Sequence, residues 1–216
     1  MSVLSNKIED VYSLTPLQEG MVFHYLKDKS STAYVFQNVY DIAYNMNDDL
    51  IKKAMSLLSY RYSVLRTSFA YEQISDICQV VLTERKTEYN CVDLSDLKDI
   101  EKNNRLKKFL NEDVKRGFDL KNDTLFRVAR IKYSDGNDKL VFTMHHIIVD
   151  GWCLKIIFNK FIEYYYKLSN NVSYDKLKNE VLNEKDNNIE YSEYIEWLGN
   201  QDKEKAIKYW EEELEG

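Results

Sequence analysis

The sequence is poor in residues that break a chain or cross-link it, with 6 glycines, 1 proline and 3 cysteines among 216 residues. So few glycines and prolines predict that the chain has no flexible linker between domains. The cysteines (Cys78, Cys91 and Cys153) are scattered, odd in number and without metal-site spacing. We therefore predict reduced thiols, as in a cytoplasmic protein, and no metal site.

Long apolar runs and clusters of basic charge are also missing. No run approaches the roughly 20 residues that span a bilayer, and residues 1–7 lack the apolar core of a signal peptide. The net charge is −6, and 44% of the residues are hydrophobic. We therefore expect no binding to nucleic acid or to membranes. The length predicts one large domain, or one lobe of a larger domain, with a substantial core.

Cap signals, turn signals and hydrophobic periodicity divide the chain into alternating helices and strands. Strands are expected at residues 34–42, 67–72, 77–83, 125–133 and 139–146. Helices are expected to start at the Thr15 and Asn47 caps, and to span 98–116, 156–168, 190–199 and 202–214. The polar stretch 170–189 is expected to be a mobile loop. The predicted fold class is an α/β or α+β sandwich, in which helices pack on a sheet.

The most informative motif spans residues 144–152 and reads Met-His-His-Ile-Ile-Val-Asp-Gly-Trp. It contains two of the three histidines and follows an apolar run that predicts a buried strand. The end of a strand on a rigid sheet is a favourable place for a catalytic side chain. Because side chains alternate along a strand, we expect His145 to point away from His146 and to bond to the scaffold.

The pattern His-His-x-x-x-Asp-Gly resembles the signature of nonribosomal peptide synthetase condensation domains, which are related to chloramphenicol acetyltransferase-like acyltransferases. Residues 12–24, 61–69 and 191–198 are similar to further family motifs in the same order, although Tyr-Ser replaces the usual His-Glu within the second. The resemblance implies a chloramphenicol acetyltransferase-like lobe, a mixed sheet with helices packed on it. Residues 12–216 would form the N-terminal lobe of a condensation domain, with the C-terminal lobe absent from this chain.

The resemblance implies amide formation between two carrier-bound thioesters, in which an acceptor amine attacks the donor thioester. An α-amino group has a pKa of about 7.7–8.0, so it is mostly protonated at neutral pH, whereas an imidazole with a pKa of about 6.5 accepts a proton there. His146 is the candidate for this role, either as base or as a group that positions the substrate. No cofactor is expected to bind directly, because phosphopantetheine arrives on the carrier proteins.

Besides His145, three residues are expected to support the site, namely Asp150, Gly151 and Arg66. Asp150 either orients His146 as in a triad or, as we prefer, forms a buried ion pair that locks the loop. The resemblance implies an arginine partner from the second motif, with Arg66 preferred over Arg61. Gly151 lets substrate approach its backbone and offers an amide to an oxyanion, unless it is a plain turn glycine. The neighbouring Trp152 is expected to be a packing residue.

The first motif also implies a subtype and a set of partners. Residues 14–24 resemble the version in domains that accept a D-configured donor and join it to an L-configured acceptor. Residues 1–11 resemble an acceptor docking segment that receives the C-terminal helix of an upstream synthetase. The expected partners are therefore upstream and downstream carrier proteins, that docking helix and the domain's own C-terminal lobe.

Three alternatives stay open at this stage. The first is a carrier-binding or docking module without catalysis. The second is an acyltransferase that uses coenzyme A, and the third is an epimerisation domain. The last shares the histidine motif but differs in its opening motif from residues 14–24 here. As an isolated lobe, the chain is expected to form little peptide product.

Overall fold

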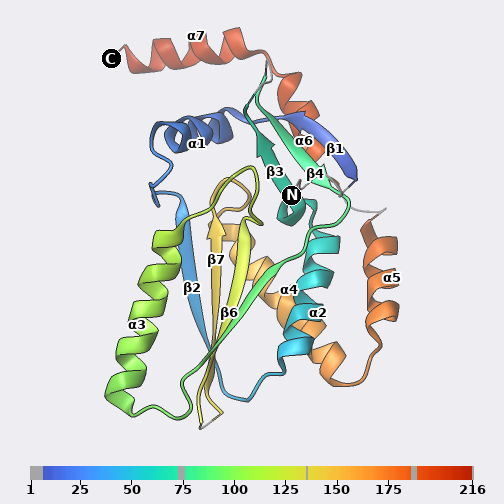
Figure 1. The fold of residues 1–216 in the computed structure, drawn as a ribbon. Helices are drawn as coiled ribbons and strands as arrows, with labels where there is room; N and C mark the ends of the chain where they lie inside the picture. Colours follow the sequence, from blue (N-terminus) through green and yellow to red (C-terminus); the bar gives the residue numbers. More distant parts are fainter. Residues whose placement is uncertain (1–6, 73–75, 135, 186–188, 216) are drawn as a thin grey trace.

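The computed structural model describes residues 7–72, 76–134, 136–185 and 189–215, and places two sheets and their covering helices among them (Figure 1). The strands are β1 (Ile8–Ser13), β2 (Val35–Ile42), β3 (Thr67–Ala70), β4 (Cys78–Leu82), β5 (Glu88–Asp93), β6 (Phe126–Lys132) and β7 (Asp138–His145). The helices are α1 (Pro16–Lys27), α2 (Asp48–Arg61), α3 (Asp99–Arg116), α4 (Gly151–Ser169), α5 (Tyr174–Lys185), α6 (Tyr191–Gly199) and α7 (Lys203–Leu214), with a 3₁₀ turn η1 (Ser63–Arg66).

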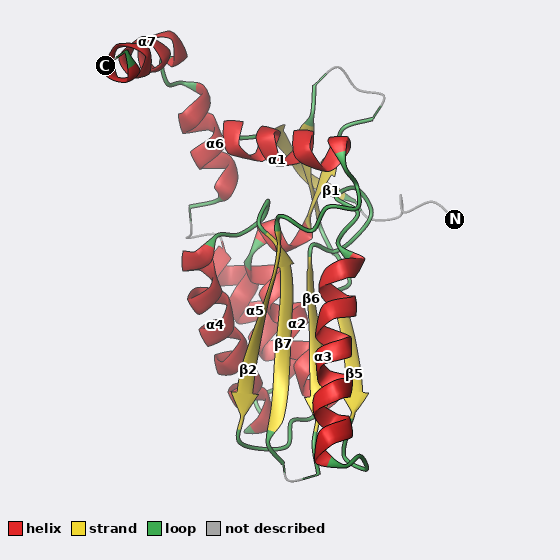
Figure 2. Cartoon of the chain, turned by 90° about the vertical axis from the view of Figure 1, so that its left-hand side faces the viewer, coloured by secondary structure: helices red, strands yellow, loops and turns green. Residues whose placement is uncertain are grey.

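The larger sheet has the strand order β2-β7-β6-β5, and the smaller sheet the order β1-β4-β3. In the larger sheet, β7 pairs antiparallel with β2 and β6, whereas β5 runs parallel to β6. Helix α3 covers one face of this sheet, and α2 and α4 cover the other, with α5 against α2 (Figures 1 and 2). This mixed sheet with packed helices confirms the predicted fold class.

The main core lies between the larger sheet and helix α4. Phe142 on β7 packs edge-on against Phe126 on β6 and Phe161 on α4, with ring centroids 5.6 and 5.3 Å apart. Tyr40 on β2 stacks on Phe158 of α4 at 3.8 Å. Burying an aromatic or large aliphatic side chain contributes roughly 1.5–3 kcal/mol. Strand β7 is therefore held rigidly by neighbours on both sides and by the helix behind it.

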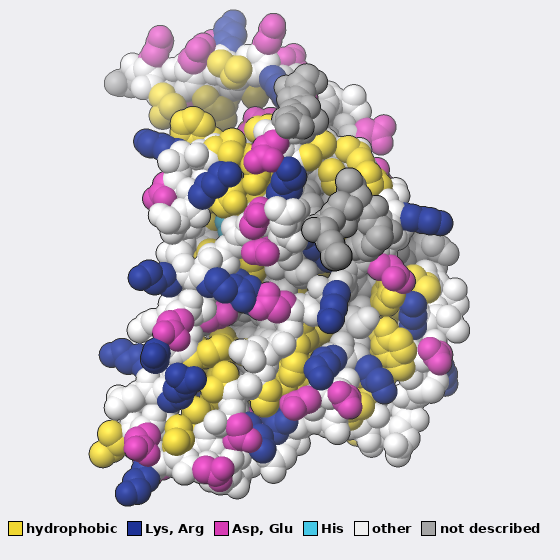
Figure 3. Space-filling view, in the orientation of Figure 1, with side chains coloured by type: hydrophobic (Ala, Val, Ile, Leu, Met, Phe, Trp, Pro, Cys, Tyr) yellow, Lys and Arg dark blue, Asp and Glu magenta, His cyan; other side chains and the backbone are white. Residues whose placement is uncertain are grey.

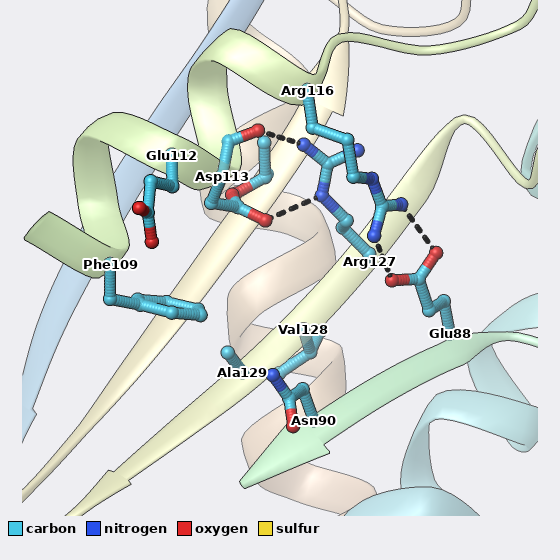
Figure 4. Close-up of a pocket in the computed structure, with 10 residues that line it drawn as sticks. Glu88, Asn90, Phe109, Glu112, Asp113, Arg116, Arg127, Val128 and Ala129 are labelled. Atoms are coloured by element: carbon cyan, nitrogen blue, oxygen red, sulfur yellow. Dashed lines mark hydrogen bonds and ion pairs between the residues drawn. The ribbon is translucent and has the colours of Figure 1, made fainter. Parts of the chain in front are cut away.

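The opposite face of the sheet carries a polar cluster beneath α3 (Figure 4). Arg127 on β6 donates from Nε to Asp113 of α3 over 2.8 Å, and the Thr143 hydroxyl donates to the same carboxylate over 2.6 Å. Beside them, Arg116 and Glu88 form a two-pronged ion pair. A cavity of about 220 Å³ lies among these side chains. Since these charges pair with one another, the cluster serves to fix α3 on the sheet.

Two expectations about helices are wrong. Helix α4 begins at Gly151 rather than near residue 156, because the Asp150 side chain caps it. The stretch expected to be a loop contains α5, in which Leu177 and Val181 lie one turn apart and are both buried. The other expected helices and strands are present, with ends that shift by a few residues.

The sequence also left two strands unpredicted, β1 and β5. Residues 8–11 of the expected docking segment belong to β1, which pairs antiparallel with β4. Residues 1–6 lie outside the described residues. The N-terminal stretch, as far as the structure describes it, is thus part of the smaller sheet.

The face of the molecule in Figure 3 mixes acidic and basic side chains without a separate basic patch, while hydrophobic side chains gather towards α6 and α7. Within the described ranges, no helix has the length and apolar character needed to cross a membrane. Helix α7 projects from the rest of the chain (Figures 1 and 2) and has no buried residue. Its exposed apolar residues include Ile207, Trp210 and Leu214.

Candidate active site

The two histidines stand where β7 ends. The His145 amide donates to the carbonyl of Leu125 over 3.1 Å, and the His146 amide donates to the carbonyl of Tyr34 over 2.8 Å. The backbone is therefore held from both sides while the chain is still extended. The side chains alternate as predicted, since His145 is only 5% exposed and His146 is exposed to solvent.

His145 is a neutral part of the scaffold. Its ring lies between those of Tyr34 and Phe118, with centroids 6.1 and 6.3 Å away. Burial, together with the neighbouring His146, lowers the pKa of His145 to about 4. Its Nδ1 accepts a hydrogen bond from the Ile147 amide over 3.1 Å. In the neutral ring the proton must then sit on Nε2.

His146 presents a free edge to solvent. Its ring packs on Phe36 at a centroid distance of 4.4 Å, and its Nδ1 lies 3.3 Å from the carbonyl oxygen of Val149. A carbonyl oxygen only accepts, so this contact is a hydrogen bond when Nδ1 carries the proton. The neutral ring then keeps its lone pair on Nε2. This arrangement suits a side chain that accepts a proton from a bound group.

A cavity of about 650 Å³ opens beside His146. Its walls come from the first turns of α1, from β3 and β4, from loop 147–150, from the start of α4 and from α6. Apolar side chains such as Leu17, Met21 and Leu198 make up much of the lining. Pockets of this size hold small organic ligands. The imidazole is therefore within reach of a molecule that enters this cavity.

Two residues of this cavity, Gln18 and Gln79, are not predicted from the sequence. They come from α1 and β4, are 6% and 2% exposed, and bond to each other. The amide group of Gln18 also donates to the carbonyl of Ile147, the residue after His146. Gln18 carried one usable signal, because Thr15 and Gln18 have the spacing of a capping box. No local pattern marked Gln79.

The structure contradicts the expected ion pair between Asp150 and Arg66. Asp150 is exposed and caps α4, with its carboxylate accepting from the amides of Trp152 and Cys153 over 3.0 Å each. Hydrogen bonds from the Cys153 side chain and backbone, and from the Trp152 amide, hold the pKa of Asp150 below its usual range. The triad interpretation is not supported either, since Nδ1 of His146 faces Val149.

Arg66 has other partners. It is 2% exposed and donates to the carbonyls of Ser59 and Leu82 and to the carboxylate of Glu9. These bonds hold α2, β4 and β1 together. Arg66 therefore has a structural role and does not pair with Asp150 as predicted. Arg61, the second choice, pairs with Glu184 on α5.

Gly151 and Trp152 open helix α4. A Cβ added at Gly151 would meet no atom within 4 Å, so the space beside its backbone is open, as expected for close approach of a ligand. Trp152 was expected to pack, but it is 86% exposed. Packing within the described residues therefore does not account for this tryptophan.

The sequence matches a known protein family over almost its whole length. A family model described as the condensation domain matches residues 8–216. A plipastatin synthase protein of Bacillus subtilis (strain 168) is 40% identical over 213 residues, which cover 97% of this chain and 8% of that protein. Bacitracin synthase 1 of Bacillus licheniformis is 34% identical over 210 residues, which cover 97% and 4% respectively. The chain thus spans less than a tenth of the length of these relatives.

Solved structures share the fold. The starter condensation domain of rhizomide synthetase RzmA matches 76% of this chain and 41% of its own, with a TM-score of 0.70 and 17% identity. The first condensation domain of the CDA synthetase matches 77% of this chain and 41% of its own, with a TM-score of 0.69 and 15% identity.

Proposed function

Because this chain belongs to the condensation domain family, we propose that it supplies the histidine-bearing lobe of an active site that forms an amide bond between two carrier-bound substrates. Condensation domains are acyltransferases that form peptide bonds, and the curated relatives are peptide synthetases. The observation that carries the proposal is the placement of His146. Its side chain is exposed, lines a cavity of about 650 Å³ and has Nδ1 tied to a carbonyl.

In the proposed reaction, the acceptor amine attacks the carbonyl carbon of the donor thioester and forms a C–N bond. Nε2 of His146 takes the proton that the amine loses. The tetrahedral intermediate then breaks its C–S bond, and the leaving thiolate takes that proton from Nε2 of His146, which returns the ring to its neutral state. A thiol with a pKa near 8.5 is a good leaving group, so placing the amine against the thioester contributes as much as proton transfer does.

The substrates are proposed to arrive on phosphopantetheine arms of carrier proteins, and the chain itself is proposed to hold no cofactor. The largely apolar lining of the cavity suits an acyl or aminoacyl chain, while His146 at its edge suits the reacting amine. The proposed partners are an upstream and a downstream carrier protein and a second lobe that closes the cavity. Synthesis of this kind is proposed to take place in the cytoplasm.

The finer assignments rest on the sequence motifs alone. A D-configured donor, an L-configured acceptor and docking of an upstream synthetase helix at residues 1–11 are proposed from residues 1–24. Loading the upstream carrier with a D- or an L-terminated peptide and comparing the two rates tests the donor preference. Equal rates would remove it.

The central test uses the whole condensation domain with loaded donor and acceptor carriers. His146→Ala is expected to lower the rate of product formation by about 100-fold or more, the usual contribution of general base catalysis. His24→Ala is the matched control, because His24 is also exposed but lies on α1 outside the cavity lining. Unfolding midpoints of both variants should stay near that of the parent domain. An unchanged rate for His146→Ala would remove this residue from the mechanism.

A further inference from the structure

The buried side-chain amides of Gln18 and Gln79 lie between the end of β1 and loop 147–150, which follows the two histidines. Gln18 and Gln79 exchange hydrogen bonds, from Nε2 of each to Oε1 of the other, over 3.1 and 3.0 Å. Oε1 of Gln18 also accepts from the Thr15 amide over 3.0 Å, and Nε2 of Gln79 donates to the Ser13 carbonyl over 2.9 Å. The pair therefore joins β1, α1 and β4 at one point.

The Gln18 side chain also donates a hydrogen bond to loop 147–150. Nε2 of Gln18 donates to the carbonyl oxygen of Ile147 over 2.9 Å. The amide of Ile147 donates to Nδ1 of His145 over 3.1 Å. Ile147, which directly follows His146, is thus held by its carbonyl and by its amide. Each of these bonds lies among buried groups, where a hydrogen bond is strong and its loss costly.

We propose that Gln18, locked by Gln79, is a positioning residue for His146. It makes no contact with the imidazole and acts through the Ile147 carbonyl. Fixing that peptide sets the direction in which the chain leaves β7, and so the distance between Nδ1 of His146 and the carbonyl of Val149. That distance decides which ring nitrogen holds the proton and where Nε2 points.

The inference rests on the proposed function for its effect on the reaction, but not for its effect on the ring. Loss of the Gln18 donor leaves the Ile147 carbonyl buried without this partner, and the loop can then relax. A displacement of about 1 Å in a catalytic group can cost about 100-fold in rate. The expected consequence is a lower kcat with a nearly unchanged KM, because the apolar lining from Leu17, Met21 and Leu198 is not altered.

The sharpest variant is Gln18→Glu. A glutamate at this position still accepts from the Thr15 amide, as in a standard capping box, so the start of α1 is kept. The donor, however, becomes a carboxylate oxygen that faces the Ile147 carbonyl and Oε1 of Gln79, both of which are acceptors. Gln18→Met removes the amide without adding charge, and it covers the case in which the glutamate variant fails to fold.

Gln37→Met is the matched control. Gln37 is also a partly buried glutamine in a polar network, since its Nε2 donates to Asp113 over 2.8 Å and to the Thr143 hydroxyl over 3.3 Å. That network joins β2 and β7 to α3, whereas the main core lies between the larger sheet and α4. A general loss of stability should therefore appear equally in this variant.

The first measurement is ¹⁵N NMR of the histidine rings in the whole domain, with His24→Ala, His145→Asn and His146→Ala giving the assignments. We expect the parent to carry the His146 proton on Nδ1, and both Gln18 variants to shift the His146 nitrogens towards a mixture of tautomers, while Gln37→Met leaves them in place. His146 signals that stay unchanged in both Gln18 variants, or that move equally in Gln37→Met, would overturn the positioning role.

The second measurement is condensation by the same variants. We expect kcat to fall by about 10- to 100-fold in Gln18→Glu and Gln18→Met, with KM changed by less than about 3-fold, and neither to change in Gln37→Met. A rise in KM with kcat unchanged would contradict the inference. The two proposals fail separately, because an active His146→Ala variant removes the base role, whereas unchanged ring nitrogens in the Gln18 variants remove only the positioning role.

Discussion

At the scale of single residues, the two adjacent histidines differ because of what surrounds each ring. The alternation of side chains at the end of β7 turns His145 into the core and His146 towards the cavity. Burial keeps His145 neutral, so its Nδ1 is available to accept from the Ile147 amide. His146 stays exposed to solvent, and among the described residues its hydrogen-bond contact is made by Nδ1. One strand position thus separates a scaffold residue from a candidate catalytic one.

The low pKa of His145 predicts a pH-dependent stability. The folded pKa of about 4 lies below the ordinary 6.5, so the unfolded chain binds a proton that the folded chain does not. Stability is therefore fully present above about pH 6.5 and is lost as pH falls towards 4. Between about pH 7.5 and pH 5, this group should remove about 2 kcal/mol from the free energy of unfolding.

Urea unfolding at the two pH values measures this loss. His145→Asn is the comparison, because its side-chain oxygen can still accept from the Ile147 amide but does not titrate. We expect the variant to lose about 2 kcal/mol less than the parent over that range. Parallel losses in the two proteins would show that His145 is not the group responsible.

The capping role of Asp150 predicts a modest and specific cost. Removing an N-cap by Asp150→Ala should destabilise the chain by about 1 kcal/mol, whereas Asp150→Asn, an equally good cap, should cost only a few tenths. A buried ion pair would instead cost about 3–5 kcal/mol in both variants. Urea unfolding at neutral pH distinguishes the two, and a large loss in Asp150→Asn would contradict the cap.

At the scale of elements, α5 shows why a polar sequence was taken for a loop. Few of its residues are apolar, but Leu177 and Val181 recur at an interval of four and both face the core. Helix α5 packs on α2, which supplies the apolar partner surface that the local pattern does not reveal. Polar residues over most of its surface are then what an outer helix requires.

Two leucines of α5 test that packing. Leu177→Ala should lower the free energy of unfolding by about 2–5 kcal/mol, because it leaves a cavity in the core. Leu182→Ala, on the same helix at a 40% exposed position, should cost less than about 1 kcal/mol. Chemical denaturation of the two variants side by side measures the difference. Similar values for both would mean that α5 is not held through its Leu177 face.

At the scale of the whole molecule, the cavity beside His146 is lined by segments that are far apart in the sequence. Its lining runs from Thr15 in the first motif to Leu198 on α6. Arg66 and the Gln18–Gln79 pair fix the smaller sheet to its neighbours, and so bring these parts to one place. Helix α7, by contrast, exposes its apolar residues in the described chain.

The proposed function predicts weak activity for these residues on their own, because a second lobe is proposed to supply the other walls of the cavity. Purified as 216 residues, the chain should form product at least about 100-fold more slowly than the whole domain, because its substrates are not held in place. Comparable rates in the same assay would show that this lobe suffices.

The sequence by itself determined the order of most elements, the fold class and the opposed directions of His145 and His146. These follow from local rules, namely capping, hydrophobic periodicity and the alternation of side chains along a strand. These local rules did not predict strands β1 and β5. Both segments are strands because they pair with β4 and β6, respectively, and that pairing depends on the fold.

Only the tertiary structure decided which side chains meet. It placed Arg66 against two carbonyls and the carboxylate of Glu9, and it joined Gln18 to Gln79 across 61 positions of sequence. A buried polar group takes whatever partner the packing brings within about 3 Å, and burial makes leaving it unpaired costly. These partners depend on the whole fold, so the spacing of residues along the chain does not predict them.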